Sequence, residues 1–311
     1  MNLVYMGLIE FPQEFVINGE VLGKEYVTQI GDKNVLIRMP VLDSDSGIKL
    51  EILKSPIQSF EFNIDWGYVV HTKTKDSFVK AAVLIFKGDE NSAQALYTAF
   101  SNWLYRFMTI VRASSHDLTK EYVVESLQHD SDGKTDKYTE LLLYRLVGSK
   151  MTYECNADKV ITAYLDDSLI YNTGISDLEM KDIMKYAGST HAISQGFFLL
   201  SEATIAYQRG DNTSCVILSS MALEEGILER INKHRKENNI KATKTGPLGK
   251  KFIILSEYGI DIPIADYKSR IVEFRNDVIH LANKVTESDA RRFWKDCRLI
   301  MKEYEYPMVT E

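Results

Sequence analysis

The stretch ADYKSRIVEFRNDVIHLAN, residues 265–283, has the apolar spacing of an amphipathic helix, and the rest of the chain is best interpreted around it. Its apolar residues recur at spacings of three and four: Ile271, Phe274, Val278 and Leu281. At about 100° per residue, His280 lies roughly 180° from Ile271 and therefore away from the core. The sequence predicts a helix with one face for its own core and a mixed face for another contact.

Three polar residues of this helix form a chemical pattern. Asn276 precedes His280 by four positions and shares nearly the same face, because residues four apart are neighbours on a helix. Arg275 lies at the edge of the apolar stripe, and its long side chain can reach around that edge. Val272 and Ile279 form a second, smaller apolar strip beside the polar face. A single His on a helix is usually structural or solvated, so the surrounding helices decide how this pattern is interpreted.

The pattern Arg275-Asn276, followed by His280, resembles that of the HEPN superfamily of all-α domains (higher eukaryotes and prokaryotes nucleotide-binding). Ribonuclease members of that superfamily carry Arg, four to six further residues and then His, often with a polar residue directly after the Arg. The resemblance covers roughly residues 189–304 and includes the order of the helices. It does not cover the N-terminal half of the chain.

Helical patterns run from about residue 176 to the end of the chain. The expected helices cover residues 177–186, 191–207, 212–237, 248–258, 265–283 and 286–304. Asn212 or Thr213 is the expected cap of the long third helix, and Thr286 begins the start signal of the last one. The last helix has a nearly ideal apolar stripe: Ala290, Phe293, Trp294, Cys297, Ile300, Met301 and Tyr304. The motif therefore lies in the penultimate helix, as the resemblance implies.

The N-terminal half has the pattern of short strands separated by turn pairs such as Asn18-Gly19 and Ser46-Gly47. Strands are expected near residues 15–17, 34–38, 48–53 and 78–86, and a helix over about 90–113 that packs on the sheet. Residues 141–147 and 160–165 fit either a strand or a helix. The predicted fold class is α+β, with a β-rich domain over residues 1–175 and an all-α, HEPN-like bundle over residues 176–311. The N-terminal domain shows no catalytic pattern, so we expect a recognition or regulatory role for it.

One residue of the long helix, Glu224, falls inside an apolar face. That face consists of Val216, Leu223, Ile227, Leu228 and Ile231, whereas Glu225 lies at its edge. A carboxylate in an apolar stripe is costly unless it is paired. Arg275 leans toward the apolar side of its own helix, so a pair across the bundle is expected, and the resemblance points the same way. Glu224 can instead reach solvent or pair with Arg230.

The long helix ends in a basic tail that contains Lys233, Arg235 and Lys236. Cations there suit the negative end of the helix dipole. Contact with an RNA backbone is the alternative with functional meaning, and we retain all three residues as candidate RNA-binding residues.

Composition limits the remaining possibilities. The 311 residues fit two domains, and the 45% apolar fraction is that of a globular protein. The net charge of -7 argues against nonspecific coating of nucleic acid, but not against a local basic site that handles one RNA backbone. The chain shows no apolar run long enough for a membrane span, no signal-peptide pattern, and three scattered cysteines without metal spacing. We therefore expect a cytoplasmic protein with reduced thiols, no metal, no cofactor and no membrane partner.

The resemblance implies a metal-independent endoribonuclease in which the RNA 2′-OH attacks its own adjacent phosphate and leaves a 2′,3′-cyclic phosphate. His280 would move protons, Arg275 would hold the phosphoryl charge, and Asn276 would complete the catalytic set. HEPN ribonucleases usually join two domains around one cleft, so a homodimer is expected. Many relatives act as toxins or as abortive-infection antiviral effectors, which implies an RNA substrate and a regulatory protein or phage-derived trigger at the N-terminal domain. A catalytically inactive dimerisation or nucleotide-binding module, or an adaptor for a separate effector, remains the alternative.

Overall fold

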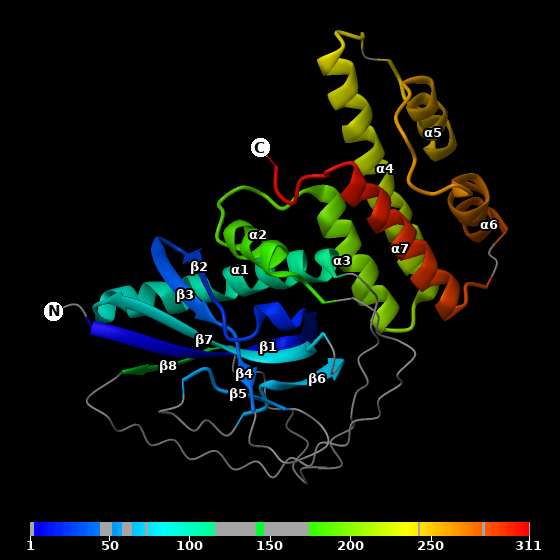
Figure 1. Cartoon of the computed structure of the whole chain (residues 1–311). Helices are drawn as coiled ribbons and strands as arrows, with labels where there is room; N and C mark the ends of the chain where they lie inside the picture. The colour runs from blue at the N-terminus through cyan, green and yellow to red at the C-terminus, as the bar shows by residue number, and fades with distance from the viewer. Residues whose placement is uncertain are drawn as a thin grey trace. The chain divides into compact units, whose positions relative to one another are not determined.

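The computed structural model describes residues 3–43, 52–57, 64–71, 74–115, 141–145, 174–241, 243–281 and 284–310. Contacts between Cα atoms divide these residues into two compact units, one up to residue 190 and one from residue 191 onward. In the described residues, the first unit contains antiparallel sheets and helices, and the second is built mainly from helices (Figure 1). The predicted mixture of an N-terminal sheet and C-terminal helices is therefore confirmed.

The sheet has six strands, in the order β2-β3-β7-β1-β8 with β6 also paired to β7. They are β1 (Leu3–Ile17), β2 (Glu25–Ile30), β3 (Lys33–Arg38), β6 (Gly67–His71), β7 (Asp76–Gly88) and β8 (Leu141–Arg145). The short helix η1 (Gly19–Val21) follows β1, and β4 (Val41–Leu42) pairs with β5 (Leu53–Lys54). All of these pairings are antiparallel.

Strand β1 is much longer than the piece at residues 15–17 that its sequence pattern reveals. Its pairing with β7 shifts register between Glu10 and Phe15. Pro12 lies inside this irregularity, and a proline cannot donate a hydrogen bond to a neighbouring strand. The regular alternation of a strand is therefore interrupted in the sequence at a point where strand β1 continues in the structure. Of the two ambiguous stretches, the first is strand β8; most of the expected strand at 48–53 and all of residues 160–165 lie outside the described residues.

Helix α1 (Glu90–Ser114) packs on the sheet, as predicted. The carboxylate of Asp89 accepts a hydrogen bond from the Ser92 amide and caps the helix start. Phe107 is fully buried and stacks on Phe11 of β1 with ring centroids 5.4 Å apart. Trp103 Nε1 donates to the hydroxyl of Thr28 on β2 at 3.0 Å.

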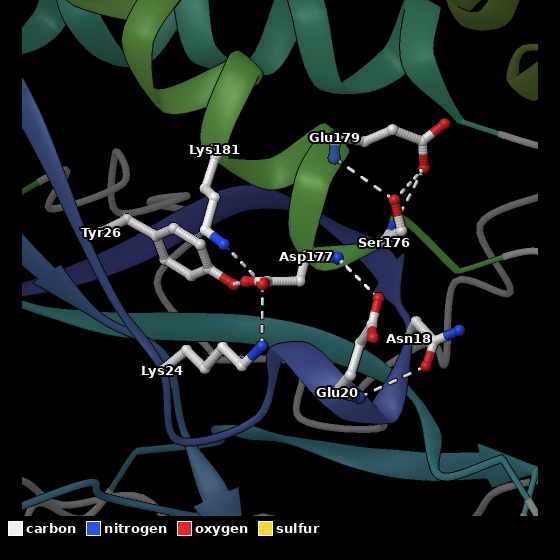
Figure 2. A network of polar contacts seen from close by, with 8 residues as sticks. All are labelled: Asn18, Glu20, Lys24, Tyr26, Ser176, Asp177, Glu179 and Lys181. Atoms are coloured by element: carbon white, nitrogen blue, oxygen red, sulfur yellow. Dashed lines mark hydrogen bonds and ion pairs between the residues drawn. The ribbon is translucent and has the colours of Figure 1, made fainter.

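A polar network around Asp177 holds helix α2 (Asp177–Ala187) against η1 and β2 (Figure 2). The Asp177 carboxylate accepts hydrogen bonds at 2.8 Å from the Tyr26 hydroxyl and the Lys181 ammonium, and its second ion pair, also at 2.8 Å, is with Lys24. The Asp177 amide donates to Glu20 at 2.9 Å. Hydrogen bonds from Lys181 and Lys24 hold the pKa of Asp177 below its ordinary value, because they stabilise the carboxylate form. Burial raises the pKa of Tyr26 well above its ordinary value, and the bond to Asp177 adds to the effect.

The boundary between the two units lies later in the chain than the sequence pattern predicts. The sequence pattern groups residues 177–186 with the C-terminal helices and places the boundary after residue 175. In the structure, α2 lies in the first unit, where it packs against α1 and β2. Its buried face consists of Met180, Ile183, Met184 and Ala187. The helix itself is where the sequence predicts it, but an apolar stripe does not indicate which neighbour will cover it.

The second unit is organised around α4 (Asn212–Glu237), which contacts the other helices of the unit (Figure 1). These are α3 (Gln195–Gln208), α5 (Leu248–Glu257), α6 (Phe274–Leu281) and α7 (Glu287–Glu303). Asp211 caps α4 by accepting from the Ser214 amide, one residue before the caps expected from the sequence. Thr286 caps α7 as predicted, and every residue of the predicted α7 stripe is buried. The helix positions in this half are therefore close to those predicted.

The motif helix differs from prediction at its start. Residues Lys268–Glu273 form a π-helical segment, η2, which leads directly into α6. A π turn holds more residues than an α turn, so a constant step of 100° does not apply across η2. The predicted core face is confirmed at Ile271 and Val278, which are buried, and His280 is exposed as predicted. Phe274 is only half-buried, and the side chain of Leu281 lies outside the described part of the structure. The side chain of Arg270 in η2 donates two hydrogen bonds to the buried carboxylate of Asp296 on α7, at 3.0 and 2.6 Å.

Two cysteines lie in the described part of the chain, Cys215 and Cys297, and both are buried free thiols. Burial raises the pKa of Cys215 to about 12 and that of Cys297 well above its ordinary value, so both stay protonated. Among the described helices, none combines the length and apolar character that a membrane crossing requires.

Candidate functional site

Helix α6 carries the three residues that the sequence singles out. Asn276 and His280 are both exposed and lie one turn apart on the same face. Arg275 is partly covered, with 23% of its side chain exposed. No described residue forms a hydrogen bond or ion pair with the His280 ring, so this imidazole is free to contact another molecule.

The guanidinium of Arg275 is held in place by two neighbours. Its Nη2 lies 3.4 Å from Glu224 Oε1 on α4, and its Nη1 donates to Asn276 Oδ1 at 3.2 Å. The Glu224–Arg275 pair predicted from the sequence is therefore confirmed. The Nε of Arg275 is buried and has no hydrogen-bond partner among the described residues. The guanidinium thus has donor capacity that its protein neighbours do not use.

Glu224 holds a second cation that sequence reasoning missed. Lys251 of α5 donates from Nζ to Glu224 Oε2 at 2.9 Å, and only 9% of the Lys251 side chain is exposed. Each carboxylate oxygen of Glu224 therefore faces one cation, Lys251 or Arg275, and α4, α5 and α6 meet at this carboxylate. A signal for Lys251 does exist in the sequence. Lys251 lies three residues after Leu248 and four before Leu255, inside the apolar stripe of α5, where an unpaired ammonium would be costly.

The three basic residues at the end of α4 behave differently from one another. Arg235 is 4% exposed, which argues against the phosphate contact predicted for it. Its Nε donates to the Tyr258 hydroxyl, and its Nη atoms donate to the carbonyl and hydroxyl of Thr243, all at 3.0 Å. Arg235 follows buried Ile231 by one turn, so it shares the buried face and ties the loop after α4 to the end of α5. Lys233 and Lys236 are exposed, so both remain candidate RNA-binding residues.

The second apolar strip of the motif helix is smaller than its sequence indicates. Val272 is half-buried and packs toward Gly249 of α5, where an added Cβ would lie 3.3 Å from Val272 Cγ1. Ile279 keeps 38% of its surface exposed. The exposed face of α6 thus presents Ile279 beside Asn276 and His280.

Within the described residues, no group of three or more His, Cys, Asp or Glu side chains is arranged to hold a metal ion. No protein-family model, curated protein or solved structure matches the chain.

Proposed function

We propose that the C-terminal helical unit is a HEPN-like endoribonuclease that cleaves RNA without a metal ion. The observation that carries the proposal is the arrangement on α6. An arginine held by Glu224 lies next to exposed Asn276, and exposed His280 follows one turn later. This places a charge-stabilising group and a proton-transfer group on one rigid element.

The chemistry needs only these groups and the RNA itself. The 2′ oxygen attacks the adjacent phosphorus, and the bond from phosphorus to the 5′ oxygen breaks. The products are a 2′,3′-cyclic phosphate and a 5′ hydroxyl. A proton leaves the 2′ oxygen and another reaches the 5′ oxygen, and imidazole side chains are suited to both transfers near neutral pH. The donors of Arg275 would stabilise the negative charge that develops on the phosphoryl oxygens.

A homodimer would complete the site. Each chain supplies one His280, whereas the reaction uses one group that accepts a proton and one that donates it. A two-fold axis along the exposed face of α6 would bring the two His280 residues together, because a symmetric interface joins the same patch of both copies. Ile279 would supply apolar contact beside them.

The N-terminal unit would then regulate this activity. A ribonuclease that cuts RNA of its own cell must be kept silent, and a β-rich unit whose sequence shows no catalytic pattern is suited to binding a regulatory protein or a phage-derived trigger. We therefore propose that the protein acts as a cytoplasmic toxin or abortive-infection effector.

One observation favours the alternative of a catalytically inactive module or adaptor. Arg275 is only 23% exposed, and two of its nitrogen atoms are already hydrogen bonded to Glu224 and Asn276. An arginine used only to hold α6 against α4 would have the same contacts. The two functions differ in whether His280 is needed for RNA cleavage.

His280→Ala and Arg275→Ala test this difference. Each is expected to reduce cleavage of RNA by about 100-fold or more, because each removes a group that acts in the reaction. His280→Ala should leave the melting temperature unchanged, since the ring is exposed and free of described partners. Lys268→Ala removes an exposed cation from η2, directly before α6, and serves as the control with full activity. A His280→Ala protein that cuts as well as the wild type would contradict the proposal.

A further inference from the structure

A strongly basic segment lies between the end of α4 and the first turn of α5. Residues 233–251 contain seven Lys and Arg residues and a single acidic residue, Glu237, in a chain whose net charge is -7. Five of the cations are exposed and define what we name the basic corner: Lys233, Lys236, Lys241, Lys244 and Lys250.

The charges of the basic corner are largely uncompensated. Among the described residues, no acidic group forms an ion pair with Lys236, Lys241, Lys244 or Lys250. Lys233 approaches Glu305 at 3.5 Å, but both side chains are at least half exposed, and such surface pairs contribute little. The corner therefore keeps a positive potential on a protein that is acidic as a whole.

Arg235 gives the corner its shape and adds to its charge. Its three hydrogen bonds hold Thr243, between Lys241 and Lys244, against the Tyr258 hydroxyl at the end of α5. All of these acceptors are neutral, and the Tyr258 ring centroid lies 5.8 Å from the guanidinium carbon. A buried cation without a carboxylate partner adds positive field to the loop that it anchors.

The helix dipole explains only part of this charge. Cations in the last turn of α4 complement the negative end of that helix. Lys250, however, lies in the first turn of α5, where the dipole is positive and a further cation is unfavourable. Pro247 at the start of α5 provides no side-chain cap, so the first amides of that helix also present positive charge. An anionic partner would offset both effects.

We propose that the basic corner binds the sugar-phosphate backbone of single-stranded RNA. The cations are spread over a loop and two helix ends, which suits a row of phosphates better than a single small anion. The corner lies in the same unit as the candidate active site, and Lys236 is twelve residues along α4 from Glu224, or about 18 Å. That the same RNA strand reaches Arg275 and His280 rests on the proposed function, whereas binding at the corner does not.

The test measures RNA binding without cleavage. Fluorescence anisotropy follows a labelled oligouridylate of about 20 nucleotides, longer than the roughly 4–16 nucleotides that one single-strand-binding fold covers. The full-length His280→Ala protein is compared with the same protein carrying Lys241→Gln, Lys244→Gln and Lys250→Gln. The control carries Lys33→Gln, Lys87→Gln and Lys185→Gln, which remove the same charge from the first unit.

The corner variant should bind about tenfold more weakly or worse, and the slope of log affinity against log salt should fall by about 2, since each phosphate contact contributes about 0.7. The control should match its parent. Equal loss in both triple variants, or no RNA binding by the parent protein, would overturn the proposal. So would binding of the parent to vesicles of phosphatidylcholine and phosphatidylserine in place of RNA. Because His280 is already replaced, these results do not depend on whether the wild type cleaves RNA.

Discussion

Replacing Glu224 by alanine should destabilise the second unit strongly, because one carboxylate holds two cations. Lys251 lies 2.9 Å and Arg275 3.4 Å from its oxygens, and Lys251 is nearly fully buried. At an effective dielectric constant of about 20, each attraction amounts to roughly 5–6 kcal/mol before the cost of burying the charges. In the Glu224→Ala protein, both attractions are lost and the two cations repel each other.

The net loss is smaller than these gross attractions. Breaking a buried ion pair by removing one partner costs roughly 3–5 kcal/mol. Glu224 and Arg275 are each about a quarter exposed, so water can solvate the stranded guanidinium in part. We therefore expect a loss of about 3 kcal/mol in the free energy of unfolding. For a unit of this size that corresponds to a decrease of roughly 10 °C in Tm.

Urea and thermal unfolding, followed by circular dichroism, measure this loss. The matched control is Glu225→Ala, the next residue of α4, which is exposed and should change stability by less than about 0.5 kcal/mol. Adding Lys251→Met to Glu224→Ala should recover part of the loss, because it removes one stranded cation. Equal and negligible shifts in the Glu224→Ala and Glu225→Ala proteins would show that Glu224 does not stabilise the unit through Lys251 and Arg275.

Two further predictions concern the first unit and the exposed face of α6. Because the pKa of Asp177 is lowered in the folded protein, its carboxylate stabilises the fold above the ordinary Asp value of about 3.9, and that stability is lost as the pH falls toward the lowered pKa. Asp177→Asn should thus lower Tm at pH 7, and the gap to the wild type should narrow in acid; a constant gap across a pH series would contradict this. Ile279→Glu should give a folded monomer that no longer cleaves RNA, as measured by light scattering and an RNA assay. A wild-type protein that is monomeric at micromolar concentration and fully active would exclude the shared site.

The helices could be predicted well because their signals are local. The α7 stripe from Ala290 to Tyr304 follows from spacing alone, and Thr286 marks its start. The Glu224–Arg275 pair could also be predicted, because a carboxylate in an apolar stripe demands a cation. The position of Lys251 inside the apolar stripe of α5 signals that it needs a partner, but the sequence does not indicate that this partner is the carboxylate that also holds Arg275.

Other features depend on tertiary context that spacing does not carry. The π turn η2 changes how side chains face along the motif helix, and no local sequence signal identified it. Arg235 has the sequence position of a solvent-facing basic tail, yet its placement one turn after buried Ile231 turns it inward. The placement of α2 in the first unit depends on Asp177 meeting Lys24 and Tyr26, which are about 150 residues away in the chain.

Whether the protein is a metal-independent ribonuclease is decided by the chemistry of the cut RNA ends. Purified full-length protein is incubated with total RNA in the presence of EDTA, and both new ends of each cut are identified, with the His280→Ala protein in parallel. Cutting is expected to continue in EDTA, to leave 2′,3′-cyclic phosphate and 5′ hydroxyl ends, and to disappear in the His280→Ala protein. Absence of cutting by the wild type, 3′ hydroxyl with 5′ phosphate ends, or equal cutting by both proteins would contradict this prediction.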